Sequence, residues 1–194
     1  CDNYGKVWLL SANEKGLFLF EDGLFRTRPG LDDYGIYFAT SICQDADGYY
    51  WIGLGENGLY KMKNDVFEKV DTGTILDHVA ITSSFISKDE VIWFGTEKGL
   101  VVYTKNKFYE YHGKILNNTK INKIISDRED NIWFATDKNG IGKLTHGKFK
   151  MNRLGVTVNC ITEDRTGRLW AGTDHGMICY ENDNEVSNLL TEYT

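Results

Sequence analysis

Tryptophan recurs through this chain at an almost fixed interval. The five residues are separated by 43, 42, 40 and 37 positions in a chain of 194 residues, and they are Trp8, Trp51, Trp93, Trp133 and Trp170. A period of about 40 to 45 residues is typical of architectures in which one supersecondary unit stacks on the next. The chain is therefore expected to be a repeat protein.

The same short phrase surrounds each Trp. An acid stands six residues before four of the five tryptophans, at Asp2, Asp45, Asp127 and Asp164, and Ser87 takes its place in the third unit. A glycine follows each Trp after six to eight residues, at Gly16, Gly58, Gly99, Gly140 and Gly176. Short apolar runs lie between these points, and none carries a convincing helical period. Each unit therefore reads as four short strands separated by turns.

A single four-stranded sheet cannot bury both of its faces, but sheets packed side by side around an axis can. A Trp supplies a large apolar wedge between neighbouring sheets. We predict an all-β fold, a β-propeller of about four complete four-stranded blades plus one partial blade, taken from a larger ring of about seven. The units are expected at approximately 1–30, 31–73, 74–113, 114–152 and 153–194, with the innermost strand of the first unit absent.

Charge and composition exclude several classes of protein. The formal net charge is −6 with interspersed signs, whereas a nucleic-acid surface needs a basic stripe. No segment approaches the ~20 apolar residues of a membrane span. The four cysteines show no metal-ligand spacing, and Cys43 and Cys160 are expected on inner strands as small buried hydrophobic residues.

The phrase resembles the repeats of two-component regulator propellers. The segments I-T-E-D-R-T-G-R-L-W-A-G-T-D-H-G-M (161–177) and I-S-D-R-E-D-N-I-W-F-A-T-D-K-N-G-I (125–141) carry the resemblance, which extends through all five units. It implies a non-catalytic, periplasmic or extracellular ligand-sensing domain of a bacterial signalling protein. It also implies further blades, a β-sandwich and a histidine kinase or diguanylate cyclase elsewhere in the parent protein. Carbohydrate fragments or other small molecules are the implied ligands, and homodimerisation is left open.

Two other propeller families and one other role are alternatives. The sialidase Asp-box places its acid five residues before the aromatic residue, whereas Asp127 and Asp164 lie six before it, so the register differs. A lyase resembling the streptogramin lyases would need a His beside acidic and metal partners. The histidines occupy unrelated repeat positions, at His78, His112, His146 and His175. A protein-interaction scaffold is the third possibility, and it would show an exposed apolar patch.

A polar ring and one loop are the candidate ligand-binding sites. Eleven residues before four of the tryptophans stand small polar residues, Thr40, Thr82, Asn122 and Asn159. Equivalent residues of inner strands form a ring around a propeller axis, where these side chains would bind either a ligand or buried backbone groups. The loop at 29–38 adds acids and aromatics, with Asp32, Asp33, Tyr34 and Tyr37 as candidates.

The acids before each Trp do not indicate calcium. Asp45-Ala46-Asp47-Gly48 lacks the alternating ligands and the bidentate acid of a calcium loop. An acid that caps its own turn is the preferred interpretation. We therefore expect no catalytic residue, no metal and no cofactor in this segment, and no nucleic-acid partner.

Overall fold

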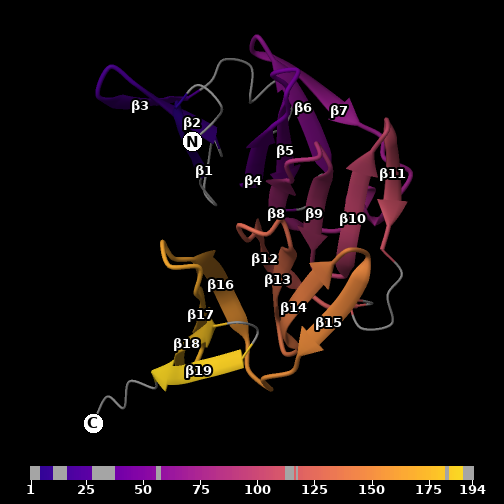
Figure 1. The fold of residues 1–194 in the computed structure, drawn as a ribbon. Coiled ribbons are helices and arrows are strands. Elements are labelled where there is room, and N and C mark those ends of the chain that lie inside the picture. Colours follow the sequence, from indigo (N-terminus) through magenta and orange to yellow (C-terminus); the bar gives the residue numbers. More distant parts are fainter. Residues whose placement is uncertain are drawn as a thin grey trace.

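The computed structural model describes residues 5–10, 17–27, 38–55, 58–111, 116 and 118–181, and the backbone of 184–189. Five antiparallel sheets follow one another along the chain (Figure 1). The first sheet comprises β1 (Val7–Leu10), β2 (Leu17–Glu21) and β3 (Leu24–Thr27). The second comprises β4 (Ala39–Gln44), β5 (Tyr50–Leu54), β6 (Leu59–Lys63) and β7 (Val66–Val70).

The other three sheets repeat the second. The third comprises β8 (Ile81–Ile86), β9 (Ile92–Thr96), β10 (Gly99–Thr104) and β11 (Lys107–Glu110), preceded by the 3₁₀ helix η1 (Ile75–Asp77). The fourth comprises β12 (Ile121–Ser126), β13 (Ile132–Thr136), β14 (Gly140–Thr145) and β15 (Lys148–Asn152). The fifth comprises β16 (Val158–Glu163), β17 (Leu169–Thr173), β18 (Gly176–Glu181) and β19 (Asn184–Leu189).

Each four-stranded sheet is a meander whose first strand lies nearest the centre of the arc. These inner strands, β4, β8, β12 and β16, contact one another in order, and β7, β11 and β15 lie at the periphery (Figure 1). The arrangement confirms the predicted all-β propeller. Since successive strands alternate in direction, the turns after the first and third strands share one end of the sheets, which we call the turn face. The inter-sheet loops lie at the opposite end, the loop face.

The tryptophans pack between successive sheets, as predicted. Trp51 in β5 is 2% exposed and packs on the third sheet, with ring centroids 6.1 Å from Phe94, 4.8 Å from Tyr103 and 6.2 Å from Phe108. Trp93 likewise lies in one apolar cluster with Phe134 of the fourth sheet. Trp51, Trp93 and Trp133 thus bury their rings against the following sheet. Burial of large aromatic rings stabilises each of these boundaries.

The acid six residues before the Trp fixes the turn between the first two strands. Asp45 accepts a hydrogen bond from the indole Nε1 of Trp51 at 2.8 Å through Oδ2, and one from the backbone N of Tyr49 at 2.8 Å through Oδ1. Asp127 and Asp164 make the same two bonds in the fourth and fifth sheets. In the third sheet the Ser87 hydroxyl accepts from Trp93 at 3.3 Å. The acid is therefore a turn cap that also anchors the Trp.

The glycine that follows each Trp by six to eight residues lies, at Gly99 and Gly140, against the backbone that leads to the next sheet. Gly99 has φ +143° and Gly140 has φ +80°, a region that L-residues rarely adopt. A Cβ at Gly140 would lie 2.2 Å from the carbonyl oxygen of Asn152, and one at Gly99 would lie 3.3 Å from that of Leu116. Both a positive φ and the close approach of backbone thus require glycine here.

Candidate functional site

The polar ring residues lie at a β-bulge in every four-stranded sheet. The register between the first and second strands shifts by one residue at Thr40, Thr82, Asn122 and Asn159. A bulged residue leaves the ladder, so its side chain can be redirected. Three of these side chains donate a hydrogen bond to a main-chain carbonyl in the inner strand of the next sheet. The pairs are Thr40 with Ile81, Thr82 with Ile121, and Asn122 with Val158, the last at 2.8 Å.

These hydrogen bonds join neighbouring sheets at their inner edge. The accepting carbonyl always belongs to the residue just before the next bulge, so the contact repeats from sheet to sheet. Asn159 is exposed, and the structure gives its side chain no such bond. The ring is thus engaged in scaffold contacts at three of its four positions, and ligand binding by it stays a prediction.

Loss of one ring hydroxyl should weaken the boundary between two sheets. Thr82→Val keeps the shape of the side chain but removes the donor to the Ile121 carbonyl. We expect the free energy of unfolding to fall by about 1 to 2 kcal/mol, because a partly buried acceptor loses its partner. Thr82→Ser, which retains the hydroxyl, should lose less than half of that amount in a urea titration followed by Trp fluorescence. Equal losses in both variants would contradict the bond's role.

The three inter-sheet loops after the second sheet each pack one leucine against the core. Leu76 in the 71–78 loop and Leu116 are fully buried, and Leu154 packs against the cluster between the fourth and fifth sheets. The 71–78 loop is also tied by Thr74, whose Oγ1 accepts from the N of Leu76, and by Glu110, which accepts from the N of Ile75. These loops therefore pack on the scaffold. Asp32, Asp33, Tyr34 and Tyr37 lie outside the described residues, so their role stays a prediction.

The described histidines lie in separate parts of the fold. His78 ends η1, His146 lies in the turn between β14 and β15, and His175 lies in the turn between β17 and β18. The His175 Nδ1 is 2.7 Å from a carboxylate oxygen of its neighbour Asp174. His112 lies outside the described residues.

Other expectations concern metals, membranes and thiols. Within the described ranges, no group of three or more His, Cys, Asp or Glu side chains is placed to hold a metal ion. No helix in the same ranges is long and apolar enough to cross a membrane.

Cys43 is partly buried, and burial raises the pKa of its thiol to about 12, so it is a poor nucleophile. Cys160 is exposed, so the expectation that it is buried was wrong: no described sheet covers its side of β16.

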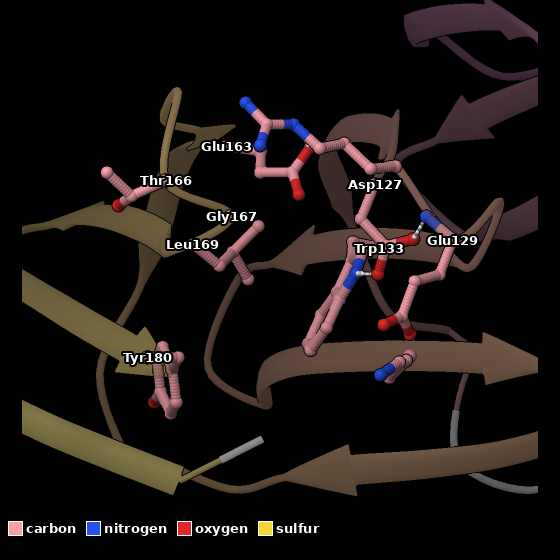
Figure 2. Close-up of a pocket in the computed structure, with 10 residues that line it drawn as sticks. Asp127, Glu129, Trp133, Glu163, Thr166, Gly167, Leu169 and Tyr180 are labelled. Carbon is pink, nitrogen blue, oxygen red and sulfur yellow. Dashed lines mark hydrogen bonds and ion pairs between the residues drawn. The ribbon is translucent and has the colours of Figure 1, made fainter. Parts of the chain in front are cut away.

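A cavity of about 240 Å³ opens on the turn face between the fourth and fifth sheets (Figure 2). Trp133 and Lys143 lie on the side of the fourth sheet, and Leu169 and Tyr180 on the side of the fifth. Asp127, Arg128 and Glu129 of one turn face Glu163, Thr166 and Gly167 of the next. The cavity thus combines aromatic and apolar walls with charges of both signs.

Arg128 spans the opening of this cavity. Its Nη2 donates to the carbonyl oxygen of Asp164 at 3.0 Å, and its Nε lies 3.8 Å from a carboxylate oxygen of Glu163. On the fourth sheet, the Lys143 Nζ lies 4.8 Å from the centre of the Trp133 ring, within cation–π distance. Two cations from one sheet therefore face the cavity.

Sequence reasoning missed this cavity because it directed attention to the loop face. A signal was present: a basic residue follows the turn acid, or its serine equivalent, in three successive units, at Lys88, Arg128 and Arg165. Comparable cavities lie on the turn face between the third and fourth sheets (about 260 Å³) and between the first and second (about 450 Å³). The described cavities therefore recur at sheet boundaries.

The turn acids make stability depend on pH. Burial of the Asp127 carboxylate would raise its pKa, but hydrogen bonds from Trp133 and Asn131 outweigh this and leave the pKa below its usual value. Hydrogen bonds from Thr166, Trp170 and Arg168 hold the pKa of Asp164 well below its usual range. A carboxylate whose pKa is lower in the folded state contributes stability above its unfolded pKa, about 3.9, and loses it as the pH falls toward the folded value.

We therefore expect the melting temperature to fall as the pH is lowered from about 5 to 3. Asp127→Asn combined with Asp164→Asn should lower the melting temperature at pH 7 and flatten its dependence on pH over that interval. Scanning calorimetry at half-unit pH steps measures both quantities. An unchanged slope in the double variant would show that other carboxylates govern acid unfolding.

The repeated sheets, their shared inner edge and the Trp wedges define the class of protein as a β-propeller. Residues 30–56 and 153–175 match the model of the two component regulator propeller family. These two segments are therefore similar to the repeats of that family. No curated protein sequence matches this chain.

Solved structures show the same fold. The extracellular domain of a protein assigned as a hybrid two component system from B. thetaiotaomicron superposes with a TM-score of 0.75 at 20% identity, over 94% of this chain and 25% of that one. A second such domain from the same organism gives 0.73 at 20% identity, over 95% and 26%. A streptogramin B lyase gives 0.76 at 19% identity, over 94% and 64%. The chain thus spans about a quarter of the first two proteins.

Proposed function

We propose that this segment is a non-catalytic sensory propeller of a bacterial signal-transduction protein, which recognises a small molecule or carbohydrate. One observation carries the proposal: the residues of the repeated phrase make hydrogen bonds within their own sheet. The turn acid binds its Trp, and the Thr of the apolar run binds the carbonyl of the following glycine, as Thr96 does with Gly99 at 2.9 Å. Since the repeated phrase serves the fold, specificity is left to residues that differ between units.

The location and the output are proposals as well. The fold shared with two extracellular domains supports an extracytoplasmic position. Because the chain spans about a quarter of those proteins, we place the relay, a β-sandwich with a histidine kinase or diguanylate cyclase, in other parts of the parent protein. Ligand binding would then bias domains outside this segment.

A ligand screen tests the proposal. Thermal-shift measurements on this chain against neutral and charged oligosaccharides and small metabolites should give a reproducible, saturable increase in melting temperature with a restricted set of compounds. Binding should leave the compound chemically unchanged, as checked by mass spectrometry. A lyase or hydrolase activity that is lost in His175→Ala would instead support an enzyme.

The lyase alternative has two observations in its favour, the shared fold and the contact between His175 and Asp174. Both side chains are exposed and adjacent in sequence, and no other described histidine lies in the same turn. A general base needs a positioned substrate and a partner that stabilises the developing charge. The pair alone supplies neither, so the sensory role is preferred.

An exposed apolar face bears on the scaffold alternative. Val7, Leu9, Phe20 and Phe25 of the first sheet are each at least 40% exposed. Three of these residues match residues of the third sheet by repeat position: Leu9 matches Phe94, Phe20 matches Tyr103 and Phe25 matches Phe108. In the third sheet those residues contact Trp51 of the second sheet. The chemistry of this face therefore fits a further blade of the same kind, and we propose such a blade as its partner.

A further inference from the structure

Two neighbouring boundaries differ at one position of the turn face. Between the third and fourth sheets, Lys88 pairs with Asp130, with 2.6 Å between Nζ and Oδ1. Lys88 is the residue after the turn cap Ser87, and Asp130 is the third residue after the turn cap Asp127. A lysine of one turn and an aspartate of the next thus form an ion pair across this boundary.

The next boundary has the base but no acid at the position of Asp130, and its arginine instead forms a longer ion pair with Glu163, with 3.8 Å between Nε and Oε2. Arg128 holds the position of Lys88, and Gly167 holds the position of Asp130. The backbone is alike at both places, with φ +63° at Asp130 and +86° at Gly167. The difference is therefore a missing carboxylate at the mouth of the 240 Å³ cavity.

Arg128 keeps donors available at that place. One N–H group binds the Asp164 carbonyl, and Glu163 lies at 3.8 Å, beyond hydrogen-bond length. A guanidinium carries five N–H donors and matches a carboxylate in a bidentate manner. Lys143 adds a second positive charge on the same wall.

We propose that this cavity binds a small monocarboxylate, whose carboxylate takes the place beside Arg128 that Asp130 takes beside Lys88. The proposal deepens the sensory function above and rests on it. Three carboxylates, Asp127, Glu129 and Glu163, also line the cavity, so they disfavour ligands with a second negative charge. The volume of about 240 Å³ admits a single ring or a short chain. Leu169 and Tyr180 offer an apolar wall to its body.

The test uses matched pairs of probes that differ in one group. Benzoate is compared with benzamide, and glucuronate with glucose, by isothermal titration and thermal shift on the intact chain. We expect at least one carboxylate to bind about tenfold more tightly than its neutral partner, since bonds between charged groups are the stronger ones. Equal affinity of each carboxylate and its neutral partner, or no binding by either carboxylate, overturns the proposal.

Four substitutions locate the site. Arg128→Met should weaken carboxylate binding about tenfold or more, whereas Lys88→Met, the matched change at the neighbouring boundary, should leave it unchanged. Gly167→Asp should abolish binding. It should also lower the melting temperature slightly, because a φ of +86° strains any L-residue. Asp130, with φ +63°, shows that aspartate can occupy this place in the turn, and a Cβ at Gly167 lies 3.8 Å from its nearest neighbour, Glu163. Asp130→Gly should create a second carboxylate site beside Lys88.

The outcomes separate this inference from the proposed function. Suppose that glucose or another neutral compound binds, that its binding survives Gly167→Asp, and that no carboxylate binds more tightly than its neutral partner. That result would leave the sensory role intact and overturn the carboxylate site. Carboxylate binding that persists in both Arg128→Met and Gly167→Asp would place the ligand elsewhere and also overturn it. Loss of binding in these two variants with retention in Lys88→Met supports it.

Discussion

Replacing Gly95 with valine is expected to lower the free energy of unfolding by about 3 kcal/mol or more, near the upper end for overpacked cores. A Cβ at Gly95 would lie 2.5 Å from Ser83 Oγ and 2.8 Å from Ile121 Cγ2. Ser83 belongs to the adjacent strand and Ile121 to the next sheet's inner strand, and both are buried. The extra atoms therefore cannot be accommodated without separating two sheets.

A urea titration monitored by circular dichroism measures this loss. Gly155→Ala is a suitable control, because a Cβ there meets no atom within 4 Å and only its φ of +69° opposes the change. It should cost about 1 kcal/mol. If Gly95→Val and Gly155→Ala lose similar amounts, close contact at the sheet boundary is not what keeps residue 95 small.

Truncation of Trp51 is expected to have an effect of similar size. Trp51→Ala removes a side chain that is 2% exposed and contacts three aromatic rings of the next sheet, so a loss of about 3 to 5 kcal/mol follows. Trp51→Phe keeps an aromatic ring but loses the bond to Asp45, and it should recover part of the loss.

The same substitution at Trp170 provides the comparison. Trp170 keeps its bond to Asp164 but is less buried than Trp51. Trp170→Ala should therefore cost about half as much or less. Equal losses at the two positions would mean that the indole bond, and not burial against the following sheet, dominates the contribution of the Trp.

The sequence was sufficient to predict the fold because the repeated residues act locally. The spacing between Asp127 and Trp133 is set by one turn and one hydrogen bond, so it recurs wherever that turn recurs. The glycine that begins the third strand, Gly99 or Gly140, is likewise required by a positive φ and a close backbone contact. A period of about 40 residues then leaves few architectures to consider.

The candidate site was harder to predict because it depends on pairs of residues in different units. That Thr82 binds the Ile121 carbonyl, 39 residues away, follows from a bulge that no local pattern reveals. The cavity beside Arg128 differs from its neighbour because Gly167 stands where the preceding unit has Asp130. This comparison has meaning only once the two turns are known to be neighbours.

The bulge contacts explain why the inner position changes between threonine and asparagine. The acceptor is a main-chain carbonyl, which every residue possesses, so the partner sheet places no demand on sequence there. A unit whose bulged residue has a short side chain that donates a hydrogen bond can therefore precede any other unit. Gene duplication, loss or reshuffling of whole units can therefore alter the number and order of blades while the hydrogen bonds between neighbouring inner strands are preserved.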